Sequence, residues 1–227
     1  MRKTLFRGED VYGTKHLFPI FLDIQGRECL VVGGGDVALR KVKSLLQCGA
    51  RVKVVAPEMT SGVQTLAGEP GLTMIRKGFE ETDLDGVFMV FCATDQDEVN
   101  ASIARLCERR GILVNVVDKP EECTFIVPSV LRRGPLSIAV STGGNSPLWA
   151  RRVRELLESV ITDEYGEFTE MLGAARDLVK KTYPDDIARR QQVFQSLVDS
   201  DIFQLLRSGQ KEKAKERMEQ CIFSLPG

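Results

Sequence analysis

The chain has 227 residues, of which 43% are hydrophobic and 28% are charged, and its formal net charge is -1. The composition is typical of a globular protein, and the length is enough for one domain with a well-buried core or for one domain plus smaller additions. The near-zero charge argues against a general nucleic-acid binder, which needs an excess of basic side chains to bind phosphates. No segment reaches the roughly 18 consecutive apolar residues of a membrane span. Residues 1–16 have no apolar core typical of a signal peptide, so we expect a cytoplasmic protein with no membrane or nucleic-acid partner.

Strands and helices are predicted to alternate between residue 20 and about residue 118. Two segments have apolar residues at helical spacing, Val37–Cys48 and Val99–Arg110. Short apolar segments, most of them rich in β-branched residues, are predicted as strands: Glu28–Val32, Arg51–Val55, Leu72–Arg76, Val87–Cys92 and Ile112–Val117. This alternation predicts an α/β fold of the Rossmann-like kind, with a parallel sheet and helices on both of its faces.

The second half of the chain has a different pattern. Two strands, Thr124–Val127 and Leu136–Ser141, are predicted on either side of the turn-like segment Arg132–Pro135. From Pro147 onward there is no clear strand, and three apolar stripes at helical spacing indicate a helical module. We therefore predict three domains: a Rossmann-like domain at 1–118, a small β domain at 119–146 and a helical domain at 147–227.

The cysteines and the histidine offer little for metal binding. None of the six cysteines forms a Cys-x-x-Cys pair, and the chain has a single histidine, His16. Cys29 and Cys92 fall in strand-like segments, and Cys48 and Cys107 fall in helix-like segments. Buried free thiols in a reducing compartment explain this pattern better than disulfides or zinc ligands. We expect no metal site.

The first predicted strand runs into the segment Gly33–Ala38, GGGDVA, which matches the dinucleotide-binding pattern G-x-G-x-x-A. Gly33 permits a tight turn, Gly35 lets a pyrophosphate approach the backbone, and Ala38 lets the helix pack close to the strand. The free N–H groups at the start of the helix would then face the phosphates. The alternative is a tight strand-to-helix turn without a ligand, but the motif lies between a strand and a helix, as nucleotide binding requires.

The ends of the other strands carry further candidates. Glu58 follows the second strand and could bind the adenine ribose hydroxyls, although a surface acid in a loop is equally consistent. Because no arginine at 56–60 could bind a 2′-phosphate, NAD is favoured over NADP. Ala93 and Thr94 end the fourth strand on the cofactor side. Asn115–Asp118 would place an amide and a carboxylate near the nicotinamide, where either catalysis or an ordinary turn explains the aspartate.

Two features suit an acidic small ligand. The loop Ser141–Pro147 leads into a helix with Ser146 as the predicted N-cap, and its exposed amides could bind a carboxylate or simply form a helix cap. Arginines also gather in this half of the chain, and their planar guanidinium groups could bind carboxylates through two hydrogen bonds. A solvated surface is the alternative for this set, which comprises Arg132, Arg133, Arg151, Arg152 and Arg154.

Four segments, FPIFLDIQGRECLVVGGGDVALRK, CATDQDEVN, NVVDKPEECTFIVPS and LSIAVSTGGNSPLWARRVRE, resemble the precorrin-2 dehydrogenase and siroheme synthase N-terminal family. The resemblance runs in order from about Leu17 to Glu158. It implies NAD-dependent oxidation of precorrin-2 to sirohydrochlorin in siroheme biosynthesis. In many members it also implies insertion of ferrous iron, a lyase activity for which iron is a substrate. It implies an NAD-binding domain, a central dimerisation domain of a homodimer and a C-terminal helical domain.

The resemblance also suggests roles for individual residues. The family's catalytic aspartate falls on Asp118, and a loop hydroxyl that is phosphorylated in at least one relative falls on Thr142. The expected cofactor contacts are Gly33, Gly34, Gly35, Asp36, Val37, Pro57, Glu58, Ala93, Thr94 and Asn115. The expected substrate contacts are Asn115, Thr142, Gly143, Gly144, Arg132 and Arg151.

The implied chemistry suits these residues. A tetrapyrrole carries many carboxylates, which basic side chains and helix termini can bind. NAD would accept a hydride, and Asp118 could accept a proton during both oxidation and metal insertion. Some chelating members have a histidine in the helical half, which this chain lacks. Alternatives are therefore a dehydrogenase without chelatase activity and an NAD-sensing regulatory module, although a sensor does not need the 118–158 features together.

Overall fold

A computed structural model describes residues 17–223 of the chain. The chain divides into two compact units between Val127 and Pro128, and each unit is described by itself. Within the described residues, every helix is too short or too polar to cross a membrane. The division into three domains at 118 and 146 remains a prediction.

The first unit is built on a five-stranded sheet in which all neighbouring strands are parallel, in the order β3-β2-β1-β4-β5. Its strands are β1 (Glu28–Val32), β2 (Arg51–Val55), β3 (Leu72–Ile75), β4 (Met89–Cys92) and β5 (Leu113–Val116). Because β1 is central, its residues pair on both sides, and Val31 lies opposite Val54 and Phe91. The Rossmann-like prediction is therefore confirmed, with β1 and β2 at the predicted residues and the other strands slightly shorter.

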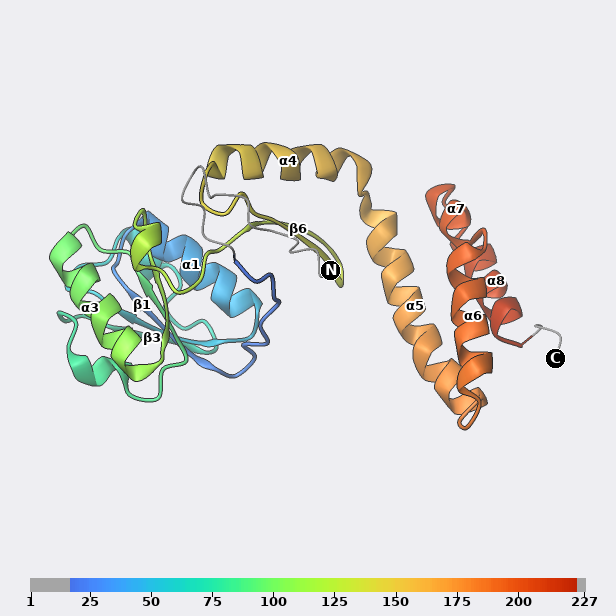
Figure 1. Cartoon of the computed structure of the whole chain (residues 1–227), viewed down its shortest axis with the longest axis horizontal. Helices are drawn as coiled ribbons and strands as arrows, with labels where there is room; N and C mark the ends of the chain where they lie inside the picture. Colours follow the sequence, from blue (N-terminus) through green and yellow to red (C-terminus); the bar gives the residue numbers. More distant parts are fainter. Residues whose placement is uncertain (1–16, 224–227) are drawn as a thin grey trace, which may run out of the picture. The chain divides into compact units, whose positions relative to one another are not determined.

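Helices cover both faces of this sheet, as Figure 1 shows for α1 and α3. Successive strand residues point to opposite faces, so Val31 packs in the cluster that contains α1 and Val32 in the cluster that contains α3. The long helices are α1 (Asp36–Gln47) and α3 (Asp97–Arg110), and the shorter elements are α2 (Ser61–Gln64) and the 3₁₀ turns η1 (Glu81–Leu84) and η2 (Pro120–Glu122).

The predicted strand Thr124–Val127 is wrong. The Thr124 N–H donates to the Val114 carbonyl over 2.9 Å, as in a sheet, but the Thr124 hydroxyl accepts the Val114 N–H over 2.8 Å. A side chain therefore takes the place of the backbone carbonyl that a ladder would need. Pro128 then follows without an N–H to donate. The segment covers the outer edge of β5 as a loop.

The hairpin lies a few residues later, in the second unit. Strands β6 (Ser129–Arg133) and β7 (Leu136–Val140) pair antiparallel, and the turn is confined to Gly134 and Pro135. Arg132 and Arg133, predicted as turn residues, therefore belong to β6.

The rest of the second unit is helical, which confirms the prediction for this part of the chain. The helices are α4 (Pro147–Val160), α5 (Asp163–Thr182), α6 (Ile187–Asp199), α7 (Ile202–Arg207) and α8 (Lys211–Phe223). Helices α5 to α8, drawn in orange and red in Figure 1, share one apolar core that includes Val179, Leu197 and Ile222. The Tyr183 hydroxyl, just after α5, donates to the Ile222 carbonyl of α8 over 2.8 Å.

Candidate dinucleotide and substrate site

The first two glycines of the motif are fixed by the ends of neighbouring strands. Gly33 has a φ of +126°, and its N–H donates to the Val55 carbonyl at the end of β2 over 3.0 Å. A Cβ atom on Gly33 would lie 2.3 Å from the Ala93 carbonyl oxygen, and one on Gly34 would lie 2.0 Å from the Glu58 carbonyl oxygen. The turn is therefore packed between the segments that follow β2 and β4, and side chains are excluded from both positions.

The third glycine has a different environment. A Cβ atom on Gly35 would meet no heavy atom within 4 Å. Gly35 is the N-cap of α1, and no side chain caps the helix, so the N–H groups of the first turn are left for a ligand. Open space in front of uncapped amides suits a diphosphate, because the helix dipole favours negative charge there. The residues present therefore fit the phosphates of a dinucleotide.

The segment after β2 lies beside the glycine turn. The Thr60 N–H donates to the Gly34 carbonyl over 2.9 Å, which ties the two loops together. Pro57 and Glu58 are both exposed. The Glu58 carboxylate thus belongs to the loop that touches the phosphate turn, which is the position that a ribose-binding acid occupies in this fold.

The end of β4 is held by a polar pair, one member of which sequence reasoning missed. The Thr94 hydroxyl donates to the Asn100 amide oxygen over 2.7 Å, and the Asn100 amide nitrogen donates back to the Thr94 carbonyl over 3.0 Å. Asn100 is buried on α3. The sequence feature that could have identified Asn100 is a polar amide one residue after Val99, at the start of the apolar face of the predicted helix. The Thr94 hydroxyl therefore positions the start of α3.

The end of β5 carries Asn115 and Asp118. Asn115 is buried, and its amide nitrogen donates to the Phe125 carbonyl over 3.0 Å, so half of the amide is used within the chain. Asp118 is exposed and has a φ of +61°, the only positive φ of a non-glycine residue among residues 17–223. Such a conformation is strained and is concentrated at functional sites. The candidate catalytic residue is thus also a conformational outlier.

A half-buried lysine near this end of the sheet was also missed. The Lys41 ammonium lies 5.2 Å from the centre of the Phe91 ring, which in turn meets Phe125 edge to face at 5.5 Å. Burial lowers the pKa of Lys41, and the neighbouring Arg40 lowers it further. In the sequence, Lys41 falls between the buried α1 residues Ala38 and Val42. A lysine on the apolar face of the predicted helix was the signal that could have identified it.

The loop before α4 is held by its own polar groups. The Thr142 hydroxyl accepts the Ser146 N–H over 3.0 Å, and the Thr142 carbonyl accepts the Asn145 N–H over 3.1 Å. The Ser141 hydroxyl accepts the Gly143 N–H over 3.1 Å. Ser146 caps α4, as predicted, by accepting the Trp149 N–H over 3.2 Å.

Among the arginines singled out from the sequence, Arg133, Arg151, Arg152 and Arg154 are paired within the second unit, the last of them with Glu158. Arg151 and Arg152 on α4 both bind Glu155, at 2.8 and 3.1 Å, and the hydrogen bond from Arg151 lowers the pKa of Glu155. Arg133 donates to the Ile161 carbonyl over 3.0 Å. Arg132 lies on β6. Arg133 therefore has a structural role, whereas Arg151 and Arg152 are exposed enough to exchange partners.

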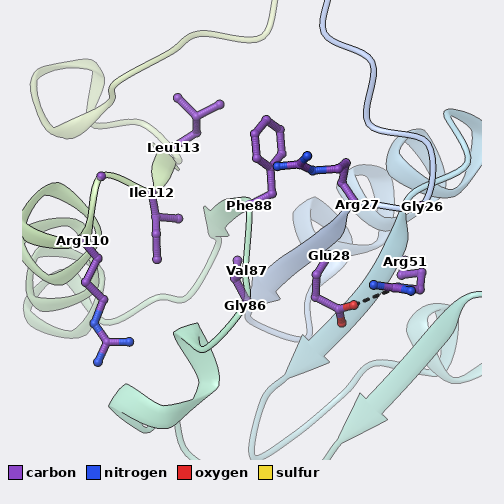
Figure 2. Close-up of a pocket in the computed structure, with 11 residues that line it drawn as sticks. Gly26, Arg27, Glu28, Arg51, Gly86, Val87, Phe88, Arg110, Ile112 and Leu113 are labelled. Atoms are coloured by element: carbon purple, nitrogen blue, oxygen red, sulfur yellow. Dashed lines mark hydrogen bonds and ion pairs between the residues drawn. The ribbon is translucent and has the colours of Figure 1, made fainter.

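The candidate cofactor residues of the first unit thus follow the carboxyl ends of β1, β2, β4 and β5, where ligands bind to parallel sheets. The cavity in Figure 2, about 410 Å³ in volume, lies at the opposite end of the strands, where β1, β4 and β5 begin. In it the Arg27 guanidinium lies over the Phe88 ring at 4.2 Å, and Glu28 pairs with Arg51. It is therefore separate from the glycine turn.

All six cysteines lie among residues 17–223 and are thiols rather than disulfides. Cys29, Cys92, Cys107 and Cys221 are buried, whereas Cys48 is exposed. Burial raises the pKa of the Cys29 and Cys107 thiols to about 11, which keeps them protonated and inert at neutral pH. Within the same residues, no group of three or more potential ligands could hold a metal ion. His16 lies outside the described residues.

Comparisons with known proteins agree along the chain. Residues 20–129 match a family described as putative NAD(P)-binding, 133–159 match the sirohaem biosynthesis protein central region, and 164–222 match the sirohaem synthase dimerisation region. The first unit is therefore an NAD(P)-binding domain of Rossmann-like fold.

Named relatives identify the family. The siroheme synthase of Thioalkalivibrio sulfidiphilus is 40% identical over 90% of this chain and 42% of its own length, and that of Ectopseudomonas mendocina is 41% identical over 90% and 44%. This chain thus spans less than half of those relatives. The solved structure of SirC, a precorrin-2 dehydrogenase, is 30% identical with a TM-score of 0.74 and covers 90% of this chain and 100% of that one. The chain belongs to the precorrin-2 dehydrogenase and siroheme synthase N-terminal family.

Proposed function

We propose that this protein oxidises precorrin-2 to sirohydrochlorin with NAD as the oxidant. The observation that carries this proposal is the match to the whole length of SirC, which is named a precorrin-2 dehydrogenase. The glycine turn with its open space at Gly35 supports the cofactor, and the strained, exposed Asp118 at the end of β5 supports a catalytic group near it.

The roles of the chain's own residues follow from their positions. The amides at the start of α1, at Asp36 and Val37, bind the diphosphate, and Glu58 binds the adenine ribose. When bound, NAD supplies the acceptor for the hydride that precorrin-2 loses. The Asp118 carboxylate takes the accompanying proton as general base. Asn115 contributes through its amide oxygen, because its nitrogen donates to Phe125.

The substrate's carboxylates need basic and amide partners. We assign this role to Arg132 and Arg151 and to the loop formed by Thr142, Gly143 and Gly144. Arg151 would exchange its exposed partner Glu155 for the substrate. A homodimer is part of the proposal, because residues 164–222 match a dimerisation region.

A second activity, insertion of ferrous iron into sirohydrochlorin, is proposed because the curated relatives are named siroheme synthases. Insertion releases two pyrrole protons, and Asp118 could accept them as it accepts the proton of the oxidation. Iron is here a substrate. A dehydrogenase without this activity remains the alternative, as does an NAD-sensing module.

The test is anaerobic incubation of the protein with precorrin-2 and NAD, followed by absorption spectroscopy, and then addition of ferrous iron. Asp118→Asn is the sharpest variant, because asparagine tolerates a φ of +61° and removes only the charge. We expect its kcat to fall by roughly 100-fold or more, with unchanged NAD affinity.

Asp118→Gly is the backbone control, since it keeps the conformation and lacks the carboxylate; it should be as inactive as Asp118→Asn. An Asn variant with full activity would remove Asp118 as the base. Metal insertion no faster than in protein-free solution would leave a dehydrogenase alone. If NAD binds but precorrin-2 is not oxidised, the sensing module becomes the better explanation.

A further inference from the structure

The loop that carries Asp118 makes three close contacts with one sulfur atom, that of Cys123. The Val116 N–H donates to the Cys123 Sγ atom over 3.1 Å. The same thiol lies 3.3 Å from the Val116 carbonyl oxygen and 3.2 Å from the Lys119 carbonyl oxygen, to either of which it can donate its proton. Asp118 therefore lies between two residues, Val116 and Lys119, whose backbone groups both bind Cys123.

Other contacts confine the loop without replacing the sulfur. The Lys119 N–H donates to the Val116 carbonyl over 3.3 Å, and the Lys119 ammonium binds the Asp97 carboxylate at 3.1 Å. The Asp97 carboxylate is exposed, so this ion pair is weak. The thiol lies on the outer edge of β5, where it accepts a backbone N–H that would otherwise lack a partner within the sheet.

The strain at Asp118 requires such a restraint. A φ of +61° is uncommon for aspartate, although less costly than for most residues, so contacts around the turn favour it over ordinary backbone angles. The turn from Val116 to Lys119 contains that strained residue, and the sulfur binds both ends of the turn. If the sulfur bonds are removed, the turn can relax toward ordinary backbone angles, and the Asp118 carboxylate moves with it.

We infer that Cys123 is a positioning residue, whose thiol holds the Asp118 turn in the conformation that the oxidation of precorrin-2 requires. This inference rests on the function proposed above. It assigns to Cys123 no contact with substrate or cofactor and no redox chemistry. The Asn115 amide nitrogen also lies 3.6 Å from the Cys123 sulfur, but the Phe125 carbonyl holds that nitrogen over 3.0 Å. The effect of Cys123 on the reaction is therefore assigned to the placement of the Asp118 carboxylate.

The first experiment measures the turn without reference to activity. Hydrogen exchange of the Val116 amide, read by NMR or by mass spectrometry of the peptide that contains it, should be slow in the wild type and at least tenfold faster in Cys123→Ala. Cys107→Ala is the control, because it removes another thiol of the first unit, a buried one on α3 that makes none of the hydrogen bonds described above for the Asp118 turn. Its Val116 exchange should match the wild type.

The second experiment measures the reaction. In anaerobic assays with precorrin-2 and NAD, Cys123→Ala should lose roughly tenfold or more in kcat, because small misplacements of a catalytic group are costly. KM for NAD should stay within about twofold, since the glycine turn is unaffected. Cys123→Ser should recover part of the kcat, because a hydroxyl can also accept and donate a hydrogen bond.

The outcomes separate this inference from the proposed function. Faster Val116 exchange in Cys123→Ala together with lower kcat and partial recovery in Cys123→Ser would support the positioning role. The inference would be overturned by an unchanged kcat in Cys123→Ala or by a loss of NAD affinity as large as the loss of kcat. A Cys123→Ser variant with a kcat no higher than that of Cys123→Ala would overturn it as well. A wild type that fails to oxidise precorrin-2 would refute the proposed function and, with it, the catalytic role of the Cys123 restraint. Hydrogen exchange at Val116 would then still decide whether the sulfur holds the turn.

Discussion

Three adjacent glycines in the first unit have three different environments. Gly33 adopts a φ of +126° against the Ala93 carbonyl, Gly34 packs against the Glu58 carbonyl, and Gly35 faces open space. Gly34 is therefore required by folding, because backbone atoms lie where its side chain would be. No described atom lies close enough to exclude a side chain at Gly35. We therefore assign this glycine to ligand binding.

We predict that alanine at Gly34 impairs folding, whereas alanine at Gly35 impairs NAD binding. Gly34→Ala should lower the free energy of unfolding by about 3 kcal/mol, because its Cβ would lie 2.0 Å from the Glu58 carbonyl oxygen. Gly35→Ala should change it by about 0.5 kcal/mol or less but raise the Kd for NAD roughly tenfold or more, because the methyl group would keep the diphosphate from the amides. Thermal unfolding and calorimetric titration with NAD measure both. Unchanged NAD affinity in Gly35→Ala would contradict the assigned site.

At the scale of elements, the hairpin and the long helix α5 pack in close contact. The Gly166 position on α5 lies against the backbone of β6, and a Cβ there would be 2.6 Å from the Arg133 carbonyl oxygen. At Gly173, about two turns further along the same helix, a Cβ would meet no heavy atom within 4 Å. One helix thus contains a glycine that packing requires and one that it does not.

We predict that alanine at these two positions shifts stability in opposite directions. Gly166→Ala should lower the free energy of unfolding by about 2 kcal/mol, because either α5 or β6 must move. Gly173→Ala should raise it by about 0.5 kcal/mol, because alanine loses less backbone entropy in a helix. Denaturant unfolding of both variants measures the difference. Two stabilised variants would show that α5 does not need its close approach to β6.

At the scale of the whole molecule, helix α4 has an apolar side that the described residues leave exposed. Trp149, Leu156 and Val160 are 58%, 64% and 62% exposed. They are spaced at helical intervals in the first of the three apolar stripes that predicted the helical module. The periodicity thus identified the helix, whereas the structure shows that much of its apolar face lies outside the core. A continuous apolar helix face of this kind is typical of a contact surface between proteins.

We predict that this face of α4 is covered in the proposed homodimer. The wild type should sediment at twice the chain mass of 25.2 kDa. Leu156→Glu should raise the dimer dissociation constant roughly tenfold or more, because it places a charge in the interface. Leu156→Met keeps an apolar side chain and should leave the dimer intact. A Leu156→Glu variant that stays dimeric would place the interface elsewhere.

Part of the candidate site could be predicted because it depends on local pattern. A strand, three glycines and a helix follow one another in the chain, and their periodicities are strong, so the turn at Gly33–Gly35 was predictable. Residues such as Asn100 and Lys41 were not predicted, because their roles depend on partners that only folding brings near, Thr94 in one case and Phe91 in the other. The prediction of a strand at Thr124–Val127 was wrong for the same reason, because the conformation of that segment depends on the hydrogen bond between Thr124 and Val114.

The amino-acid sequence by itself determined the class of fold, since short apolar segments that alternate with segments of 3.6-residue period predict a parallel sheet with helices on both faces. It also determined the dinucleotide turn, whose small residues are a local requirement. Only the tertiary structure decided the conformation of Asp118 and what holds it. The thiol of Cys123 meets Val116 only when the chain turns back along the edge of β5, and a contact between residues apart in the chain has no periodic signature.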